Sequence, residues 1–207
     1  MNTVANSSTG TGSRPGGGTG GGSGSGGARG RTRRAILDAA TSVLAKNSGA
    51  SLGDVATAAG VGRTTVHRYF PERSDLVRAL GADVLEKVAA ATERARVESG
   101  AALDALERLC QELFELGDAL SLVFDDSLSA AWNWEGWEED TDADRALVRL
   151  VERGQAKGEF DTELDAQWIA EVLWALLYAA WERSRQGSTK HEALTLCLRT
   201  LRKAATP

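Results

Sequence analysis

The chain has 207 residues, of which 42% are hydrophobic, and a formal net charge of −5 at pH 7. This length allows one or two modest cores, which excludes a large multidomain enzyme. No uninterrupted apolar run reaches the roughly 18 to 20 residues that a membrane span needs, and the N-terminus lacks the apolar stretch of a signal peptide. We therefore expect a cytoplasmic protein.

The charge is divided unevenly along the chain. Residues 1–78 carry ten Lys or Arg against four Asp or Glu, a net charge of +6. Residues 79–207 therefore carry a net charge of −11. Only the N-terminal part suits a polyanion such as DNA.

The first 30 residues hold twelve of the 23 glycines and little that could fill a core, which predicts a disordered Gly/Ser-rich tail. A phosphate-binding loop is disfavoured because no Gly-Lys-Ser/Thr ending follows. The basic residues next along the chain are Arg29, Arg31, Arg33 and Arg34. Such an arm suits DNA phosphates or a minor groove, and a merely solvated basic run is the alternative.

Three short helices are expected next. Residues 32–46 have apolar side chains at intervals of three and four, which is typical of a helix with one buried face. Ser51 and Asp54 have the spacing of a capping box that starts a second helix, which Gly60 ends. A third helix runs over residues 64–70 up to Pro71. Helix, glycine turn and short helix form a helix-turn-helix unit, whose second helix offers its N-terminal residues to the major groove.

The polar side chains of this last helix suit DNA. Arg63 can bond guanine edges or phosphate, and Thr64 can meet a phosphate or a thymine methyl group. Val66 and Phe70, four residues apart, are better explained as its buried face.

These segments resemble the TetR family of transcriptional regulators. The matching stretches are residues 34–40, 55–61 and 65–76, the last reading TVHRYFPERSDL. The resemblance implies base contacts from Gly62, Arg63, Thr64 and Arg68. It also implies phosphate contacts from Ser51, Thr65, His67, Tyr69 and Arg73. Gly62 stands where the family often has a capping Ser, His67 where it often has Tyr, and Arg73 where Lys is common.

Residues 72–207 are predicted to be helical almost throughout. The expected helices cover residues 74–98, 101–116, 120–131, a segment from Thr141 closed by Gly154 and Gly158, 164–185 and 190–204. Thr141 and Asp144 repeat the capping-box spacing at the start of the fourth of these helices. The predicted fold is all-α. A three-helix helix-turn-helix DNA-binding domain spans residues 31–78, and a helical effector-binding and dimerisation domain spans residues 79–207.

The last two helices carry more apolar surface than one neighbouring helix would cover. In the TetR family the final two helices pair with their twins in a four-helix dimer interface, so the resemblance implies a homodimer on a near-palindromic operator. The alternative is a wholly intramolecular core around Trp168, Trp174 and Trp181.

The segment AWNWEGWEED, residues 131–140, combines three tryptophans with four acidic residues. Indole faces attract flat organic cations and carboxylates neutralise them, which predicts an effector site here. The candidate effector-binding residues are Asp125, Asp126, Trp132, Trp134, Glu135, Trp137, Trp174 and Tyr178. An acidic surface loop whose tryptophans cap the core is the alternative.

The resulting hypothesis is a repressor that a small molecule, such as an aromatic cation, releases from DNA. An effector-independent activator or architectural DNA-binding protein is the alternative. We expect no enzyme, because neither His67 nor His191 has an obvious nucleophile to pair with. Cys110 and Cys197 are expected to be reduced, packed thiols, and no cofactor or metal site is expected.

Overall fold

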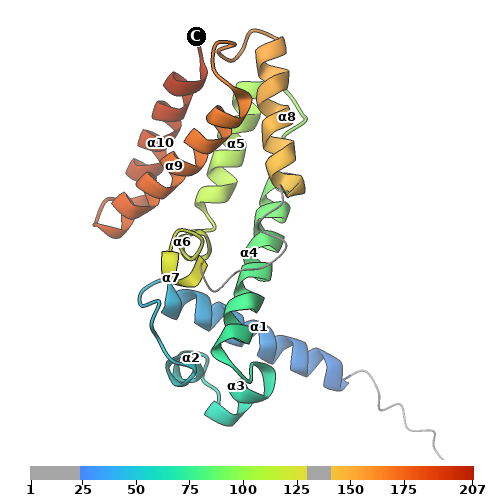
Figure 1. The fold of residues 1–207 in the computed structure, drawn as a ribbon, viewed down its shortest axis with the longest axis vertical. Helices are drawn as coiled ribbons and strands as arrows, with labels where there is room; N and C mark the ends of the chain where they lie inside the picture. Colours follow the sequence, from blue (N-terminus) through green and yellow to red (C-terminus); the bar gives the residue numbers. More distant parts are fainter. Residues whose placement is uncertain (1–23, 130–140) are drawn as a thin grey trace, which may run out of the picture.

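The computed structural model describes residues 24–129 and 141–207, and within these ranges every regular element is a helix (Figure 1). The helices are α1 (Gly24–Leu44), α2 (Leu52–Ala58), α3 (Arg63–Tyr69), α4 (Arg73–Ala95), α5 (Ala102–Phe114), α6 (Asp118–Ser121), α7 (Asp126–Ser129), α8 (Asp142–Ala156), α9 (Ala166–Arg185) and α10 (Lys190–Ala205). None of these described helices is long and apolar enough to cross a membrane.

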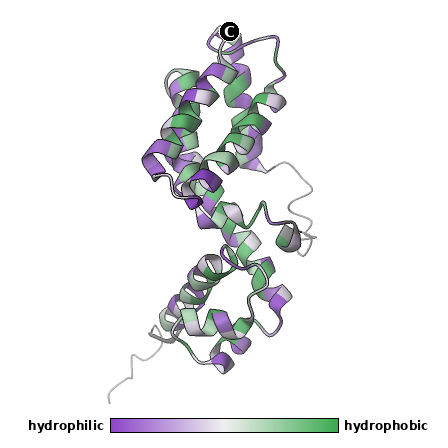
Figure 2. Cartoon of the chain, turned by 90° about the vertical axis from the view of Figure 1, so that its left-hand side faces the viewer, coloured by the Kyte–Doolittle hydropathy of each residue, from purple (hydrophilic) through white to green (hydrophobic). Residues whose placement is uncertain are grey.

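The molecule is elongated and has two hydrophobic cores. Helices α1 to α3 lie at one end, here called the head, and α4 runs from the head into the remaining helices, here called the body (Figure 1). Hydrophobic and hydrophilic segments alternate along the helices, as expected where each helix buries one face (Figure 2). The head core contains Ile36, Leu37, Ala40, Leu44, Ala50, Val55, Ala56, Val66, Phe70, Leu76, Val77, Leu80, Leu122 and Leu128.

Side-chain caps explain where α2 and α8 begin. The Asp54 backbone N–H donates to the Ser51 hydroxyl at 3.2 Å, and the Asp54 carboxylate accepts from the Ser51 N–H at 2.8 Å. Thr141 and Asp144 make the same pair of bonds before α8, at 3.1 and 3.0 Å. Both predicted capping boxes are confirmed. Gly60 follows α2 with φ +65°, a left-handed conformation that turns the chain towards α3.

Helix α1 begins at Gly24, well before the predicted start at Thr32, so residues 24–30 are helical and are not part of a structureless tail. Residues 27–31 are exposed, so packing does not hold this first part in place. Extending an existing helix is far easier than nucleating one, and the Thr32 hydroxyl adds a bond to the Ala28 carbonyl at 3.0 Å.

The single helix predicted over residues 120–131 is wrong. The structure has two short helices, α6 and α7, with residues 122–125 between them. The Asp125 carboxylate accepts from the backbone N–H groups of Ser127 and Leu128 at 3.0 and 3.2 Å, which starts a new helical turn. Leu122 and Leu128, each 1% exposed, anchor this segment in the head core.

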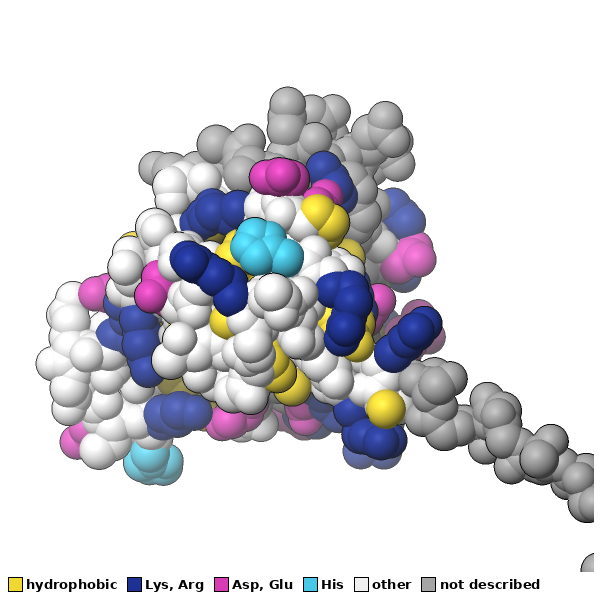
Figure 3. Space-filling view, turned by 90° about the horizontal axis from the view of Figure 1, so that it is seen from below, with side chains coloured by type: hydrophobic (Ala, Val, Ile, Leu, Met, Phe, Trp, Pro, Cys, Tyr) yellow, Lys and Arg dark blue, Asp and Glu magenta, His cyan; other side chains and the backbone are white. Residues whose placement is uncertain are grey.

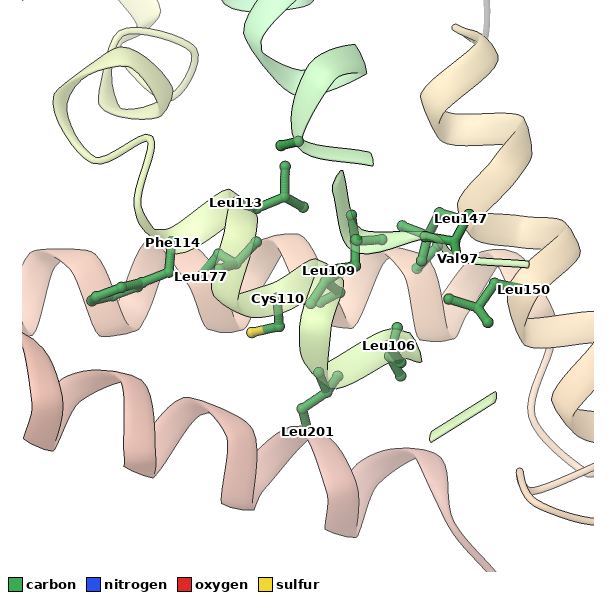
Figure 4. Close-up of a cluster of buried hydrophobic side chains, with 14 of the residues drawn as sticks. Val97, Leu106, Leu109, Cys110, Leu113, Phe114, Leu147, Leu150, Leu177 and Leu201 are labelled. Atoms are coloured by element: carbon green, nitrogen blue, oxygen red, sulfur yellow. The ribbon is translucent and has the colours of Figure 1, made fainter. Parts of the chain in front are cut away.

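The body core surrounds α5, which lies between α8 and the α9–α10 pair (Figure 4). Cys110 of α5 and Cys197 of α10 are both buried and free, with their Sγ atoms 3.6 Å apart, as expected for packed thiols. Gly154 does not close α8 but lies inside it. A Cβ at Gly154 would lie 2.1 Å from Cδ2 of the buried Phe160, so the glycine makes room for that ring.

Helices α9 and α10 lie side by side (Figure 1), and they carry several large apolar side chains that stay exposed. Trp168 is 55% exposed, so the intramolecular alternative is wrong for this residue. Trp174 and Trp181 are half-buried against the body core. Tyr178 and Leu196, 45% and 49% exposed, remain uncovered within the single chain.

Candidate DNA-binding surface and effector pocket

The exposed side of α3 carries the polar residues predicted to meet DNA. Gly62 is its N-cap, with extended backbone and no side-chain cap. The exposed residues are Gly62, Arg63, Thr64, His67 and Arg68, and the half-buried ones are Thr65 and Tyr69. Val66 and Phe70 are 0% and 3% exposed, which confirms that they form the buried face.

Ring contacts and one hydrogen bond order the polar side chains around α3. Arg68 Cζ lies 5.5 Å from the Tyr69 ring centroid, and Arg33 Cζ lies 5.6 Å from that of Phe70. The second contact holds the basic part of α1 beside α3. His67 Nδ1 lies 3.3 Å from the Pro71 carbonyl oxygen, which can only accept. Nδ1 therefore carries a proton, and Nε2 is the ring nitrogen left for a further contact.

Two of the residues expected to contact phosphate already have partners within the head. The Ser51 hydroxyl lies 2.7 Å from Asp54 Oδ2 in the capping box. Arg73 Nε donates to the Ala50 carbonyl at 3.4 Å, and its Nη2 donates to the Ser48 carbonyl. Arg73 therefore ties the loop before α2 to the start of α4, and a phosphate contact from it rests on the remaining N–H groups of its guanidinium.

The end of the molecule that carries α2 and α3 is rich in basic side chains. Seen from this end, Lys and Arg side chains surround a histidine, and most acidic side chains lie towards the rim (Figure 3). A surface of this charge attracts the phosphate backbone of DNA.

The body contains a pocket with a cavity volume of about 270 Å³. It is lined by Val84, Leu85, Val88, Leu120, Val123, Phe124, Thr141, Asp144 and Trp174. These residues come from α4, α6 and the chain after it, the start of α8, and α9. Among the described lining residues Asp144 is the charged one, and its Oδ2 accepts from the Thr141 hydroxyl at 2.6 Å. A pocket whose described lining is largely apolar and includes a carboxylate suits an aromatic cation.

A smaller cavity of about 140 Å³ lies next to this pocket, at the junction of head and body. Phe124 lines both, and its ring centroid is 5.0 Å from that of Tyr178, with the ring planes tilted by 56°. Asp125 and Tyr178 line this second cavity. The Ser127 hydroxyl and neighbouring backbone groups bond to the Asp125 carboxylate and lower its pKa, so it keeps its negative charge.

A partly buried ion pair joins α1 to the pocket helix α4. Asp83 is 5% exposed and directly precedes the pocket residue Val84. Its Oδ1 lies 2.5 Å from Arg34 Nη1 of α1, and its Oδ2 lies 2.8 Å from Lys87 Nζ. A shift of α4 at the pocket therefore also displaces the carboxylate that holds α1.

Comparison with known proteins identifies the family. Residues 36–80 match the family model described as bacterial regulatory proteins, tetR family. Over 180 residues the chain is 40% identical to the HTH-type transcriptional repressor LfrR of Mycolicibacterium smegmatis, which covers 84% of this chain and 89% of LfrR. The chain belongs to the TetR family.

Two further comparisons agree with this assignment. The HTH-type transcriptional regulator NfxB of Pseudomonas aeruginosa is 31% identical over 170 residues, which covers 76% of this chain and 86% of NfxB. The crystal structure of LfrR from Mycobacterium smegmatis in complex with proflavine aligns with a TM-score of 0.62 and 38% identity, over 83% of this chain and 95% of that one. The chain is thus a helix-turn-helix transcriptional regulator and not an enzyme.

The TetR-type body separates the residues predicted to bind effector. Trp174 lines the pocket, whereas Asp125 and Tyr178 line the smaller cavity beyond Phe124. Asp126 belongs to α7, but its side chain is outside the described part of the structure. The predicted residues Trp132, Trp134, Glu135 and Trp137 lie outside the described residues.

Sequence reasoning missed most of the residues that line the TetR-type pocket. Val84 and Val88 resembled an ordinary buried stripe of the connecting helix, and Asp144 was recognised only as part of a capping box. One available signal was that Asp144 lies in the first turn of the helix that follows the tryptophan-rich segment. A cap carboxylate can also face a ligand, since only Oδ2 bonds to the Thr141 backbone and hydroxyl.

Proposed function

We propose that this regulator is a cytoplasmic repressor that binds a near-palindromic operator as a homodimer and is released by a planar aromatic cation. The observation that carries the proposal is the pocket built against α4, the same helix whose first turns belong to the head core. The DNA contacts are those predicted for α3 and the residues around it.

Two connections support coupling between the pocket and the head. Val84, Leu85 and Val88 line the pocket from α4, beside the Asp83 ion pair with α1. Val123 lines it from the segment whose neighbour Leu122 is buried in the head core. A ligand that binds one arrangement of these walls more tightly than another favours the position of the head that goes with it. Its effect on DNA affinity cannot exceed the difference between its binding free energies for the two arrangements.

The outer surface of α9 and α10 supports the homodimer. A groove of about 420 Å³ lies between the two helices and is lined by Tyr178, Ala179, Leu196 and neighbouring residues. A second copy that covers this groove by twofold symmetry buries the apolar side chains left uncovered in one chain. Two recognition helices then meet major grooves roughly 34 to 36 Å apart, or a multiple of that distance.

Aromatic and acidic lining supports the ligand class. Trp174 supplies an indole face and Asp144 a carboxylate in the same pocket. The relative LfrR was crystallised with proflavine, whose ring system is flat, aromatic and cationic.

Fluorescence anisotropy of a labelled duplex from the gene's own upstream region tests the proposal. Tight, salt-sensitive binding that proflavine reverses is the expected result. Binding that no aromatic cation disturbs would keep the DNA-binding role and favour an effector-independent regulator. A monomer at the concentration of half-saturation would contradict the homodimer.

Replacing Asp144 with asparagine should weaken proflavine binding roughly tenfold, because the pocket loses a negative charge while the amide oxygen can still accept the capping hydrogen bonds at the start of α8. Acridine has the same ring system without the amino groups and is uncharged at neutral pH, so its affinity should change little. Tryptophan fluorescence quenching measures both ligands. An equal loss of affinity for proflavine and acridine would mean that the substitution changes the shape of the pocket and that the lost charge is not the cause.

A further inference from the structure

The guanidinium group of Arg63 lies against a glycine of the neighbouring helix. Gly53 is near the start of α2, and a Cβ built there would lie 2.9 Å from Arg63 Nη2, 3.2 Å from Nε and 3.3 Å from Cζ. Three atoms of one planar group at similar distances place its face over the bare Cα of Gly53. A methyl group at this position would occupy the space of the guanidinium.

A fixed carboxylate lies beside this position. Hydrogen bonds from the backbone and hydroxyl of Ser51 lower the pKa of Asp54, and the charge of Arg63 lowers it further. Asp54 Oδ2 is held by the Ser51 N–H and hydroxyl at 2.8 and 2.7 Å. The capping box of α2 therefore presents an immobile negative charge to the arginine of α3.

The backbone does not explain the glycine. Gly53 lies inside a regular helix and is absent from the residues with positive φ in the described chain. Alanine is a better helix former than glycine at such a position, so the glycine weakens a short helix. The space that it leaves for Arg63 is the feature that offsets this cost.

We propose that Gly53 is a positioning residue for sequence recognition, whose missing side chain sets where the Arg63 guanidinium meets DNA. The inference rests on the proposed function, in which Arg63 contacts base edges. A guanidinium reads guanine through two parallel hydrogen bonds, which need the planar group at a defined place and angle. Holding it over Gly53 in the free protein reduces the side-chain entropy lost on binding.

The test uses the full-length protein and an operator selected by the wild type from random duplexes. Anisotropy titrations compare this operator, its single base-pair variants and an unrelated duplex. Gly53→Ala should reduce discrimination at the base pair read by Arg63 about tenfold, with unchanged affinity for the unrelated duplex and an equal or higher Tm. Gly30→Ala is the matched control, because Gly30 is also helical and has nothing within 4 Å of a built Cβ.

A double variant separates this role from others. In an Arg63→Ala background, Gly53→Ala should cause no further loss of discrimination. Full discrimination by Gly53→Ala, or an equal loss in both backgrounds, would overturn the inference while the proposed function stands. If the wild type itself does not distinguish any selected duplex from the unrelated one, the proposed function fails and the inference fails with it.

Discussion

Replacing Arg68 with alanine is expected to weaken operator binding by roughly 10- to 100-fold, which corresponds to about 1–3 kcal/mol for one lost guanidinium contact. Arg68 is exposed on α3 and contacts the Tyr69 ring, so its loss leaves the head core unchanged. Anisotropy with the operator measures the affinity, and thermal unfolding checks that Tm stays within a few degrees of the wild type.

Arg149→Ala is the matched control for Arg68→Ala. Arg149 is exposed on α8 in the body, so this variant loses the same charge far from the head. Its operator affinity should equal that of the wild type. If both variants bind as the wild type does, Arg68 makes no energetically important contact with DNA.

Phe160→Ala should lower the free energy of unfolding by about 3–5 kcal/mol, because the ring is 0% exposed and its removal leaves a cavity in the body core. Urea unfolding followed by tryptophan fluorescence measures the free energy of unfolding. Wild type and variant must be compared at one protein concentration, because the proposed homodimer would make stability depend on it. A loss below about 1 kcal/mol would show that the surroundings collapse onto the vacated space.

Gly154→Ala tests the same contact from the other side. A Cβ 2.1 Å from Phe160 Cδ2 cannot be accommodated, so we expect a loss of about 1–3 kcal/mol although alanine favours the helix. In the Phe160→Ala background the methyl group meets no ring, and the same substitution should be neutral or stabilising. Additive effects of the two changes would contradict the contact.

The elements with strong local signals were predictable from the sequence. The capping boxes at Ser51 and Thr141 are short-range patterns, and the structure starts α2 and α8 one residue later. The buried face of α3, Val66 and Phe70, follows from helical spacing alone. The family resemblance covers the first of these capping boxes and α3 but does not reach α8.

The errors lie where long-range packing decides the structure. Leu122 and Leu128 continued a helical pattern in the sequence, but the head core holds both and the chain between them bends. Gly154 resembled a helix end, and only contact with Phe160, a residue of the following loop, shows that it lies inside α8.

The effector site was located only in part for a similar reason. Trp174 and Tyr178 are four residues apart on one helix, so periodicity placed them on one face. The ring of Phe124 separates the cavities that they line. Which side of this ring each residue occupies depends on how the chain after α6 packs against α9, and no local pattern encodes it.

The burial of Leu122 and Leu128 in the head core bears on how such regulators can be recombined. The match to the family model ends at residue 80, yet the head core also contains Leu122 and Leu128, which lie much further along the chain. A chimera that joins residues 1–80 of this chain to the body of a relative would have the relative's side chains at both positions. To combine a new operator specificity with a new ligand specificity, the α6–α7 segment should therefore be taken from the same parent as the DNA-binding head.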